Sequence, residues 1–351
     1  MTFRKIVRIC PVFLALLAVS PLGAQKAKVH QWSLDRPDAH GPISITEDRT
    51  LQAGELQLTL RFINQVLSGQ GSGTDSLTVE QVLGLFQAVP TELLRQGVGV
   101  NLSLGLTDRL SLSATGTFVQ KSMEYLSPLA GEPNFYLWYQ TESMGPEDIQ
   151  VTALYDVFNS GAFRAHLQGG VSIPVGPIDA GDQTPFSDPS EVQLPYQQQL
   201  GSGTLDILPG FTVSVQNEVA SLGIQGKAVI RMADNSRDWA LGDIYQGTMW
   251  ASYVLSDYFS VSMAAQYATW GQVEGTDAEL DPFQDPAANT LATAGSRIDL
   301  PVGFNLLIPE GRFAGHRLGV EFILPIHQDL DGPQLRHDWA VVVGWKKSVS
   351  F

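Results

Sequence analysis

Charged and amide side chains recur inside stretches of the sequence that are otherwise apolar. Arg164 and His166 are two residues apart, and Arg317 and Glu321 are four apart. An even spacing places both residues on one face of a β-strand, because strand side chains alternate between faces. Such a face suits a channel wall, which selects solutes by charge and hydrogen bonding. We predict that eight residues line a polar lumen: Arg61, Asn101, Arg164, His166, Asp299, Asn305, Arg317 and Glu321.

The sequence lacks the patterns that usually accompany catalysis or metal binding. The histidines show neither HxxxH nor HExxH spacing, and no G-x-S-x-G motif is present. Acidic groups such as Asp329 and Asp331 do not form a complete calcium loop, so solvated loops are favoured for them. We expect no catalytic residues, no metal site and no cofactor. A lipid hydrolase is the less favoured alternative, because it would need a Ser–His pair near the outer rim.

The chain contains about twelve stretches with the period-two pattern of β-strands. In the last of them, Trp339, Val343, Trp345 and the terminal Phe351 share one face, while small and polar residues occupy the other. An apolar face that carries tryptophans suits contact with lipid. The predicted strands are 54–66, 96–106, 109–120, 148–158, 162–175, 205–216, 220–232, 243–255, 258–270, 297–308, 315–326 and 337–351.

The connections between these stretches alternate in length. Short polar or Gly/Pro turns are expected at 107–108, 159–161, 217–218, 256–257 and 309–312, and every other connection is longer. In hydrocarbon, backbone amides find partners only within the protein, so strands must close into a barrel. We therefore predict an all-β fold, a closed antiparallel transmembrane β-barrel with short periplasmic turns and long outer loops.

The N-terminus predicts export from the cytoplasm. Basic residues followed by an apolar run over residues 1–24 are typical of a signal peptide, which contains the only cysteine, Cys10. The polar, irregular residues 25–53 are expected to form a periplasmic N-terminal segment or a partial plug, and residues 54–351 the outer-membrane barrel. The formal net charge of −15 argues against nucleic-acid binding, which requires a basic surface.

One helix is predicted, in the first long loop. Residues 77–88 place Val82, Leu83 and Phe86 near helical spacing, and Thr78 with Gln81 fits a capping box. This helix either constricts the mouth of the barrel or packs against its rim.

Four phrases of the sequence look familiar together. They are GTDSLTVEQVL with AVPTEL, SIPVGPIDAGDQTP, LPYQQQLGSGTLDILPG and LPIHQDLDGPQL. They resemble the outer-membrane transporters grouped as the "MetA-pathway of phenol degradation" family, over most of the mature chain. The resemblance implies transport linked to aromatic compounds and supplies no catalytic or ligand residues.

The predicted function is a channel or transporter in the outer membrane of a Gram-negative type of cell. Its solutes would be small, and aromatic or hydrophobic ones fit the resemblance. Expected partners are outer-membrane lipid, the solute and the barrel-assembly machinery, which would contact the strand ending at Phe351. The main alternative is a closed barrel that acts through its long loops as a structural or surface-interaction protein.

Overall fold

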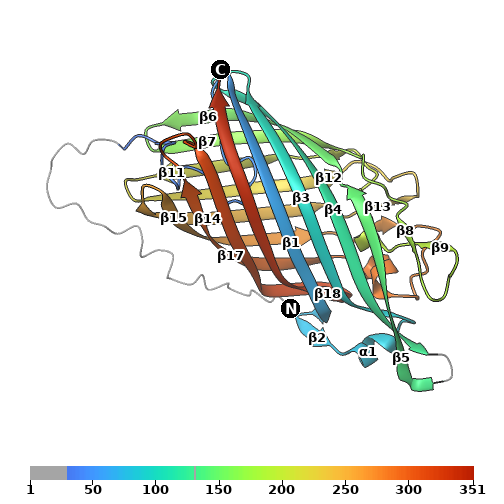
Figure 1. Cartoon of the computed structure of the whole chain (residues 1–351). Coiled ribbons are helices and arrows are strands. Elements are labelled where there is room, and N and C mark those ends of the chain that lie inside the picture. Colours follow the sequence, from blue (N-terminus) through green and yellow to red (C-terminus); the bar gives the residue numbers. More distant parts are fainter. Residues whose placement is uncertain (1–29, 130–131) are drawn as a thin grey trace, which may run out of the picture.

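The fold is a closed antiparallel β-barrel (Figure 1). The computed structural model describes residues 30–129 and 132–351, so the predicted signal peptide, and with it residues 25–29, lies outside the described residues. Eleven strands form the ring in chain order: β1 (Glu55–Gly73), β3 (Val89–Gly105), β4 (Leu110–Leu129), β6 (Ile149–Ser160), β7 (Phe163–Ile173), β11 (Gly210–Gln216), β12 (Ala220–Arg231), β14 (Ile244–Ser256), β15 (Phe259–Trp270), β17 (Gly295–Leu307) and β18 (His316–Ser350).

The first and last strands close the ring. The β1–β18 ladder runs from Glu55 opposite Ser350 to Gly71 opposite Gln334. The first part of β18, up to Leu330, pairs with β17. β18 therefore spans the height of the barrel twice. The twelve predicted strands therefore correspond to eleven labelled strands, because β18 contains both of the last two predicted ones, 315–326 and 337–351. The prediction of a long loop at 327–336 is wrong. The chain reverses there in a tight turn, in which Gly332 has a φ of 79°.

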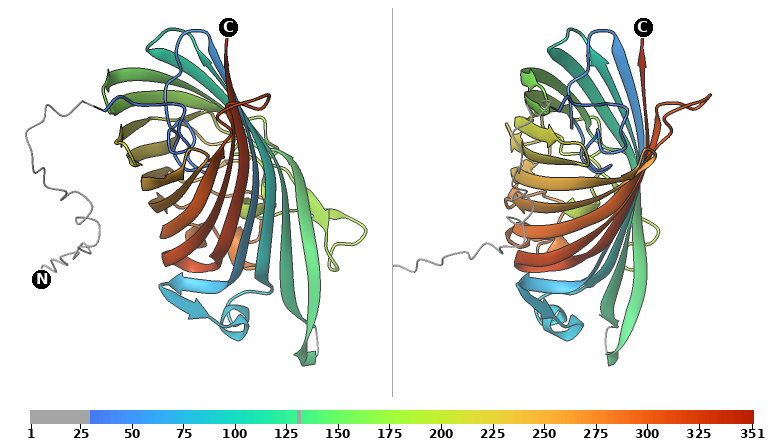
Figure 2. Two further views of the ribbon diagram at one scale, coloured as in Figure 1. Left: turned by 60° about the vertical axis from the view of Figure 1, so that its left-hand side comes forward. Right: turned by 90° about the vertical axis from the view of Figure 1, so that its left-hand side faces the viewer.

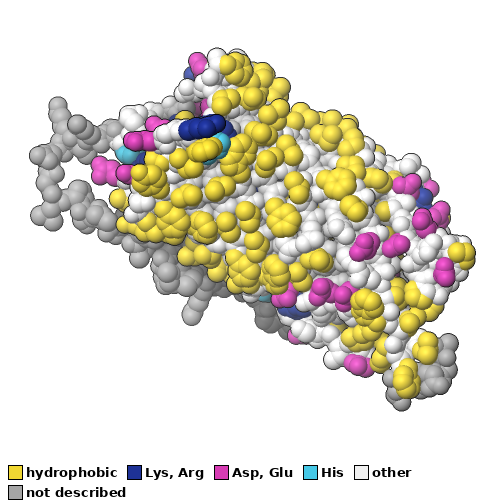
Figure 3. Space-filling view, viewed as in Figure 1, with side chains coloured by type: hydrophobic (Ala, Val, Ile, Leu, Met, Phe, Trp, Pro, Cys, Tyr) yellow, Lys and Arg dark blue, Asp and Glu magenta, His cyan; other side chains and the backbone are white. Residues whose placement is uncertain are grey.

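Side chains alternate across the wall as predicted. Arg61 is 8% exposed, whereas the next residue, Phe62, is 43% exposed on the outer side. In β18, Val342 and Lys346 are buried and Val343 is exposed. Figure 3 shows mainly apolar side chains over the strands, with acidic ones mostly toward the two ends of the barrel. A closed ladder with this outer face satisfies its backbone amides in a lipid bilayer.

The two ends of the barrel differ in their connections. At one end, called the short-turn end, residues 106–109, 161–162, 217–219, 257–258 and 308–315 join the strands. The other, called the long-loop end, carries the remaining elements: β2 (Asp75–Leu77), α1 (Val79–Leu83), β5 (Glu132–Pro146), β8 (Gly181–Gln183), β9 (Glu191–Gln193), η3 (Tyr196–Gln198), β10 (Asp206–Ile207), β13 (Trp239–Ala240), β16 (Glu274–Gly275), η4 (Pro286–Ala288) and η5 (Thr290–Ala292). Among the described residues, no helix has the length and apolar character to cross a membrane.

Strand β4 is longer than the sequence predicts. The predicted strand ends at residue 120, but β4 continues to Leu129 and pairs there with β5. The added part buries Met123 and Tyr125 in a cluster with Leu93 and Tyr139. Tyr125 and Tyr139 stack with ring centroids 5.0 Å apart. The ladder therefore extends because its inward side chains still find an apolar core.

Three long loops meet above the lumen. Trp239 is fully buried and packs with Tyr196 and Val273, which come from different loops. The rings of Tyr196 and Trp239 meet edge to face, 5.1 Å between centroids. Arg237 adds an ion pair to Asp277, with 2.6 Å between Nε and the carboxylate oxygen. These contacts join the loops into one unit at the long-loop end.

Candidate functional site

Residues 30–53, called here the inner segment, lie inside the barrel. Figure 2 shows this segment as the dark blue chain surrounded by the ring of strands. Both of its ends contact the short-turn end: the Trp32 amide donates to the Gly161 carbonyl (3.0 Å), and the Leu51 amide donates to Ser111 Oγ (2.8 Å). Between these ends the chain reaches Lys227 and turns back. Glu47, at the turn, has a φ of 52°, which a non-glycine residue rarely adopts.

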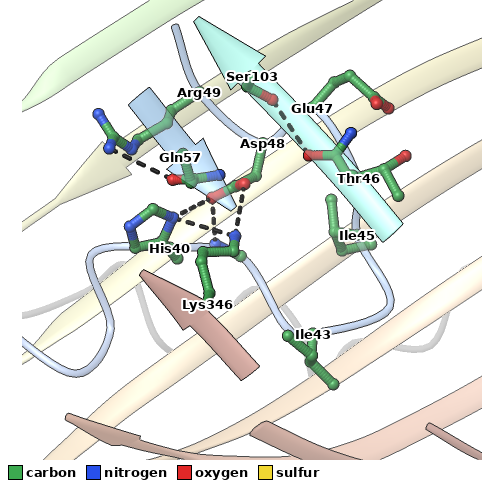
Figure 4. Close-up of polar contacts among 12 residues, drawn as sticks. His40, Ile43, Ile45, Thr46, Glu47, Asp48, Arg49, Gln57, Ser103 and Lys346 are labelled. Carbon is green, nitrogen blue, oxygen red and sulfur yellow. Dashed lines mark hydrogen bonds and ion pairs between the residues drawn. The ribbon is translucent and has the colours of Figure 1, made fainter. Parts of the chain in front are cut away.

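A buried charge cluster holds the returning arm of the inner segment (Figure 4). The Asp48 carboxylate accepts from Lys346 Nζ (3.1 Å) and the Gly41 amide (3.0 Å), and it contacts His40 Nδ1 at 3.0 Å. Asp48, His40 and Lys346 are each less than 9% exposed. Removing one partner from such a cluster would leave an uncompensated buried charge, which is strongly destabilising.

A second ion pair holds the tip. Lys227 on β12 contacts the Glu47 carboxylate at 2.5 Å. Gln225, two residues earlier, donates to the Thr46 carbonyl (2.9 Å), and His166 on β7 contacts the Glu47 carbonyl (3.0 Å). Strands on one side of the wall therefore hold the tip, while β18 holds Asp48.

Five of the eight predicted lumen residues contact the inner segment. Arg61 donates to the Ile43 carbonyl (2.7 Å), and Arg317 donates to the Arg36 carbonyl (2.8 Å). Glu321 accepts from the Ser44 amide at 2.5 Å. The other two are His166, described above, and Arg164, whose guanidinium lies 4.7 Å from the centroid of the Trp32 ring.

Of the remaining three predicted residues, two bond elsewhere on the wall. Asn101 donates to Ser113 and Thr115 on β4, and Asp299 accepts from Arg297 at 2.8 Å. Asn305 points to the inner side near Gly319. The sequence also suggests selectivity from opposed wall charges, with Arg61, Arg164 and Arg317 set against Asp299 and Glu321. Among the described residues, none of these arginines forms an ion pair with either carboxylate. Arg61, Arg317 and Glu321 instead form hydrogen bonds with the inner segment.

Three adjoining cavities occupy the lumen beyond the inner segment. The first, of about 300 Å³, lies below the loops and includes Tyr196, Trp270 and Val273 in its lining. The second, of about 420 Å³, shares Lys121 and Arg231 with the first. The third, of about 210 Å³, is bounded by the inner segment at Thr46 and Glu47, and it shares Gln150, Val229 and Ile244 with the second. The interior is thus filled in one part and partly empty in the other.

The predicted helix is present but shorter than expected. It spans Val79–Leu83, and both hydrogen bonds of the capping box between Thr78 and Gln81 are formed. Val82 is fully buried, and Leu83 and Phe86 are half-buried. The following backbone bonds to a neighbouring loop, where the Ala88 amide donates to the Gln284 carbonyl (2.8 Å). Figure 1 places α1 at the long-loop end, beside β2, and its role as a constriction stays a prediction.

Several charged residues of the interior are absent from the predicted set. Strand alternation places Lys346 on the inner side, but nothing in the sequence identifies Asp48 as its partner. Lys121 lies just past the predicted strand end. Lys227 lies where the alternation of β12 fades, since residues 226–231 are all half-buried.

The chain shares its fold with a known outer-membrane channel. The sequence matches no protein family and no curated protein. The structure is similar to an outer membrane channel from Pseudomonas putida F1, with a TM-score of 0.56 and 12% identity over 87% of this chain and 99% of that one. A Pseudomonas aeruginosa FadL homologue aligns at a TM-score of 0.40 and 11% identity, over 93% and 96% of the two chains. At these identities, the first comparison shows a common β-barrel fold.

Proposed function

We propose that this chain is an outer-membrane channel for small solutes, in which the inner segment acts as a movable stopper. The observation that carries the proposal is the series of adjoining cavities inside a closed ring, extending from the loops to the tip of the inner segment. A wall that is polar inside and apolar outside is what a channel in a lipid bilayer requires. The short-turn end would face the periplasm and the long loops the exterior.

The fold likeness and the sequence phrases point to the same class of protein. The similar structure from Pseudomonas putida F1 is itself described as an outer membrane channel. The four sequence phrases resemble the phenol-degradation transporters, and membership of that family is part of the proposal. We accordingly propose aromatic or otherwise apolar small molecules as solutes.

The inner segment is held in a way that suits displacement. The inner segment contacts the barrel wall largely through backbone carbonyls, backbone amides and charged side chains, as at Ile43, Ser44 and Asp48. A buried ion pair adds little net stability compared with well-packed apolar side chains of the same volume. Displacing the segment exposes polar groups, and water in the lumen can then hydrate them.

A structural barrel is the second candidate, and one observation favours it. The inner segment fills part of the lumen with ion-paired side chains, which is typical of a closed barrel. In that case the long loops would provide the function, and the cavities would have no passage to the periplasm. The two candidates differ in whether the inner segment can leave its position.

Planar-bilayer recordings of the refolded protein test the proposal. The full mature chain should show a small or intermittently open conductance. A chain that lacks residues 25–53 should show a larger and steadier one, provided that heat-modifiable migration in gel electrophoresis confirms a folded barrel. If neither chain conducts, the channel proposal fails and the structural barrel is favoured.

A further inference from the structure

The cavity below the loops has an unusual charge for this acidic protein. Its lining includes four of the chain's 21 Lys and Arg residues and none of its 36 Asp and Glu residues. The four are Arg95, Lys121, Arg231 and Arg297, and His337 joins them. Chance placement in a chain of net charge −15 would favour acidic residues. The positive lining therefore indicates a cavity that attracts anions.

Three of the four cations already have carboxylate partners, none of which lines the first cavity. Arg95 contacts Glu147 at 2.7 Å, and Arg297 contacts Asp299 at 2.8 Å. Arg231 forms an ion pair with Asp206. These pairs reduce the net charge, but the guanidinium groups and not the carboxylates of Asp206 and Asp299 border the first cavity.

Lys121 differs from the three arginines because no carboxylate of the described residues forms an ion pair with it. Its Nζ donates to the backbone carbonyls of Gln197 (3.2 Å) and Gln199 (2.6 Å). Glu147 and Asp148 line the second cavity together with Lys121 but form no ion pair with it. The side chain is 9% exposed, so its charge has lost most of its hydration. A buried ammonium that has carbonyl contacts but no counter-ion can be stabilised by an incoming anion.

Position and size make Lys121 a suitable binding residue. Lys121 and Arg231 border both the first and the second cavity, so a solute that moves between these cavities must pass the two cations. The first cavity, at about 300 Å³, is at the lower end of the usual range for small-molecule sites. It can enclose one small organic molecule.

Apolar and aromatic side chains form much of the rest of the lining, beside four glutamines. Leu67, Leu241 and Val273 border the cavity together with the rings of Tyr196 and Trp270. Trp270 is held in place by its Nε1, which donates to the Thr293 carbonyl at 2.8 Å. A bare inorganic anion would leave these surfaces without a partner. An anion with an apolar body would cover them and bring its charge to the cations.

We propose that this cavity is a binding site for small organic anions, namely carboxylates with an aromatic or similarly apolar body, and that Lys121 provides their main charge contact. The proposal rests on the channel function proposed above and specifies its solute class. The second cavity also has Glu147 and Asp148 in its lining, so the excess of cations belongs to the first cavity. There it favours anions over cations, which gives the positive lining a function.

Three isosteric ligands test the site: benzoate, benzamide and benzamidine carry negative, neutral and positive charge on nearly the same frame. Calorimetric titration of the full mature protein in detergent should show benzoate binding about 10- to 100-fold more tightly than benzamide, as a charge-assisted bond at Lys121 predicts. Benzamidine should not bind measurably. Acetate should bind more weakly than benzoate, because it lacks the apolar body.

Three lysine variants identify the residue responsible. Lys121→Gln should remove the preference for benzoate over benzamide, whereas Lys121→Arg should retain it. Lys347→Gln is the matched control: this lysine is not among the residues that line the cavity, and it contacts the Ala314 carbonyl at the short-turn end. Thermal unfolding of each variant shows whether loss of the Gln197 and Gln199 contacts has disturbed the loop.

Bilayer recordings separate failure of this site from failure of the channel. In a salt gradient, the reversal potential of the wild-type protein should indicate preference for anions, and Lys121→Gln should reduce it. Benzoate binding without any conductance would refute the channel and leave the binding site supported. Equal affinity for benzoate and benzamide, or acetate binding as tightly as benzoate, would overturn the site.

Discussion

Replacing Asp48 with asparagine should release the inner segment. The substitution keeps the size of the side chain but removes the charge that Lys346 Nζ contacts at 3.1 Å. Both side chains are no more than 5% exposed, so Lys346 would keep a buried charge without a counter-ion. Breaking one partner of a buried ion pair usually costs about 3–5 kcal/mol. Since about 1.4 kcal/mol corresponds to a tenfold change, the ratio of released to docked segment should rise by roughly 100- to several thousand-fold.

Planar-bilayer recordings and limited proteolysis measure this ratio independently. The Asp48→Asn protein should open more often, and a protease should cleave residues 30–53 faster while the barrel stays intact. Asp35→Asn is the matched control, because Asp35 belongs to the same segment but is exposed. Unchanged opening and unchanged cleavage in Asp48→Asn would show that the charge cluster does not hold the segment.

The double variant Asp48→Asn/Lys346→Gln tests whether the cost of Asp48→Asn comes from an unpaired buried charge. Removing both charges leaves no unpaired ion, so the double variant should release the segment less than Asp48→Asn alone. If the two substitutions have additive effects, the cost does not come from an unpaired buried charge. The physical account given for the cluster would then be wrong, even if the segment moves.

Three further perturbations test separate parts of the structure. Gly344→Ala should also loosen the inner segment, because the added Cβ would lie 2.4 Å from Ile43 Cγ1; adding Ile43→Ala should restore protease resistance. Burial raises the pKa of Asp285 from 3.8 to about 7, so protonation of this carboxyl favours the docked loop, and docking should weaken as the pH rises from about 4 to 7. Hydrogen exchange of residues 281–292 should then speed up beyond its intrinsic pH dependence, and Asp285→Asn should abolish that excess. Trp239→Ala removes the fully buried ring that joins three loops; it should cost about 3–5 kcal/mol of local stability and make those loops sensitive to protease, whereas substitution of the exposed Phe283 should not.

The wall could be predicted from the sequence because its side chains alternate between a polar interior and an apolar outer face. The contrast between Arg61 and Phe62 repeats along most strands, and the turn lengths then suffice to indicate a closed barrel. Strand ends were less predictable. Residues 327–336 contain Asp, Gly and Pro, which is typical of a loop. The ladder with β17 nevertheless continues to Leu330 and the ladder with β1 includes Gln334, because backbone hydrogen bonds do not depend on the side chains.

The site was predictable only in part, for a physical reason. Alternation identifies which wall residues point inward, and Arg61, His166 and Glu321 do so. It does not identify what they contact, because the inner segment is irregular and has no period to read. Its contacts join residues far apart in the chain, such as Asp48 and Lys346. Lys121 was missed because its strand continues past the last clearly alternating stretch.

The two halves of the lumen use charge in different ways. Around the inner segment, Asp48 and Glu47 each face a lysine of the wall, so the wall and the segment neutralise each other. In the cavity below the loops, Lys121 has no such partner among the described residues, although it is also buried. A permanently closed structural barrel would gain stability from a carboxylate or an apolar residue at that place, because an unpaired buried charge is costly. Retaining this cost is consistent with a site that acquires its counter-ion from the solute.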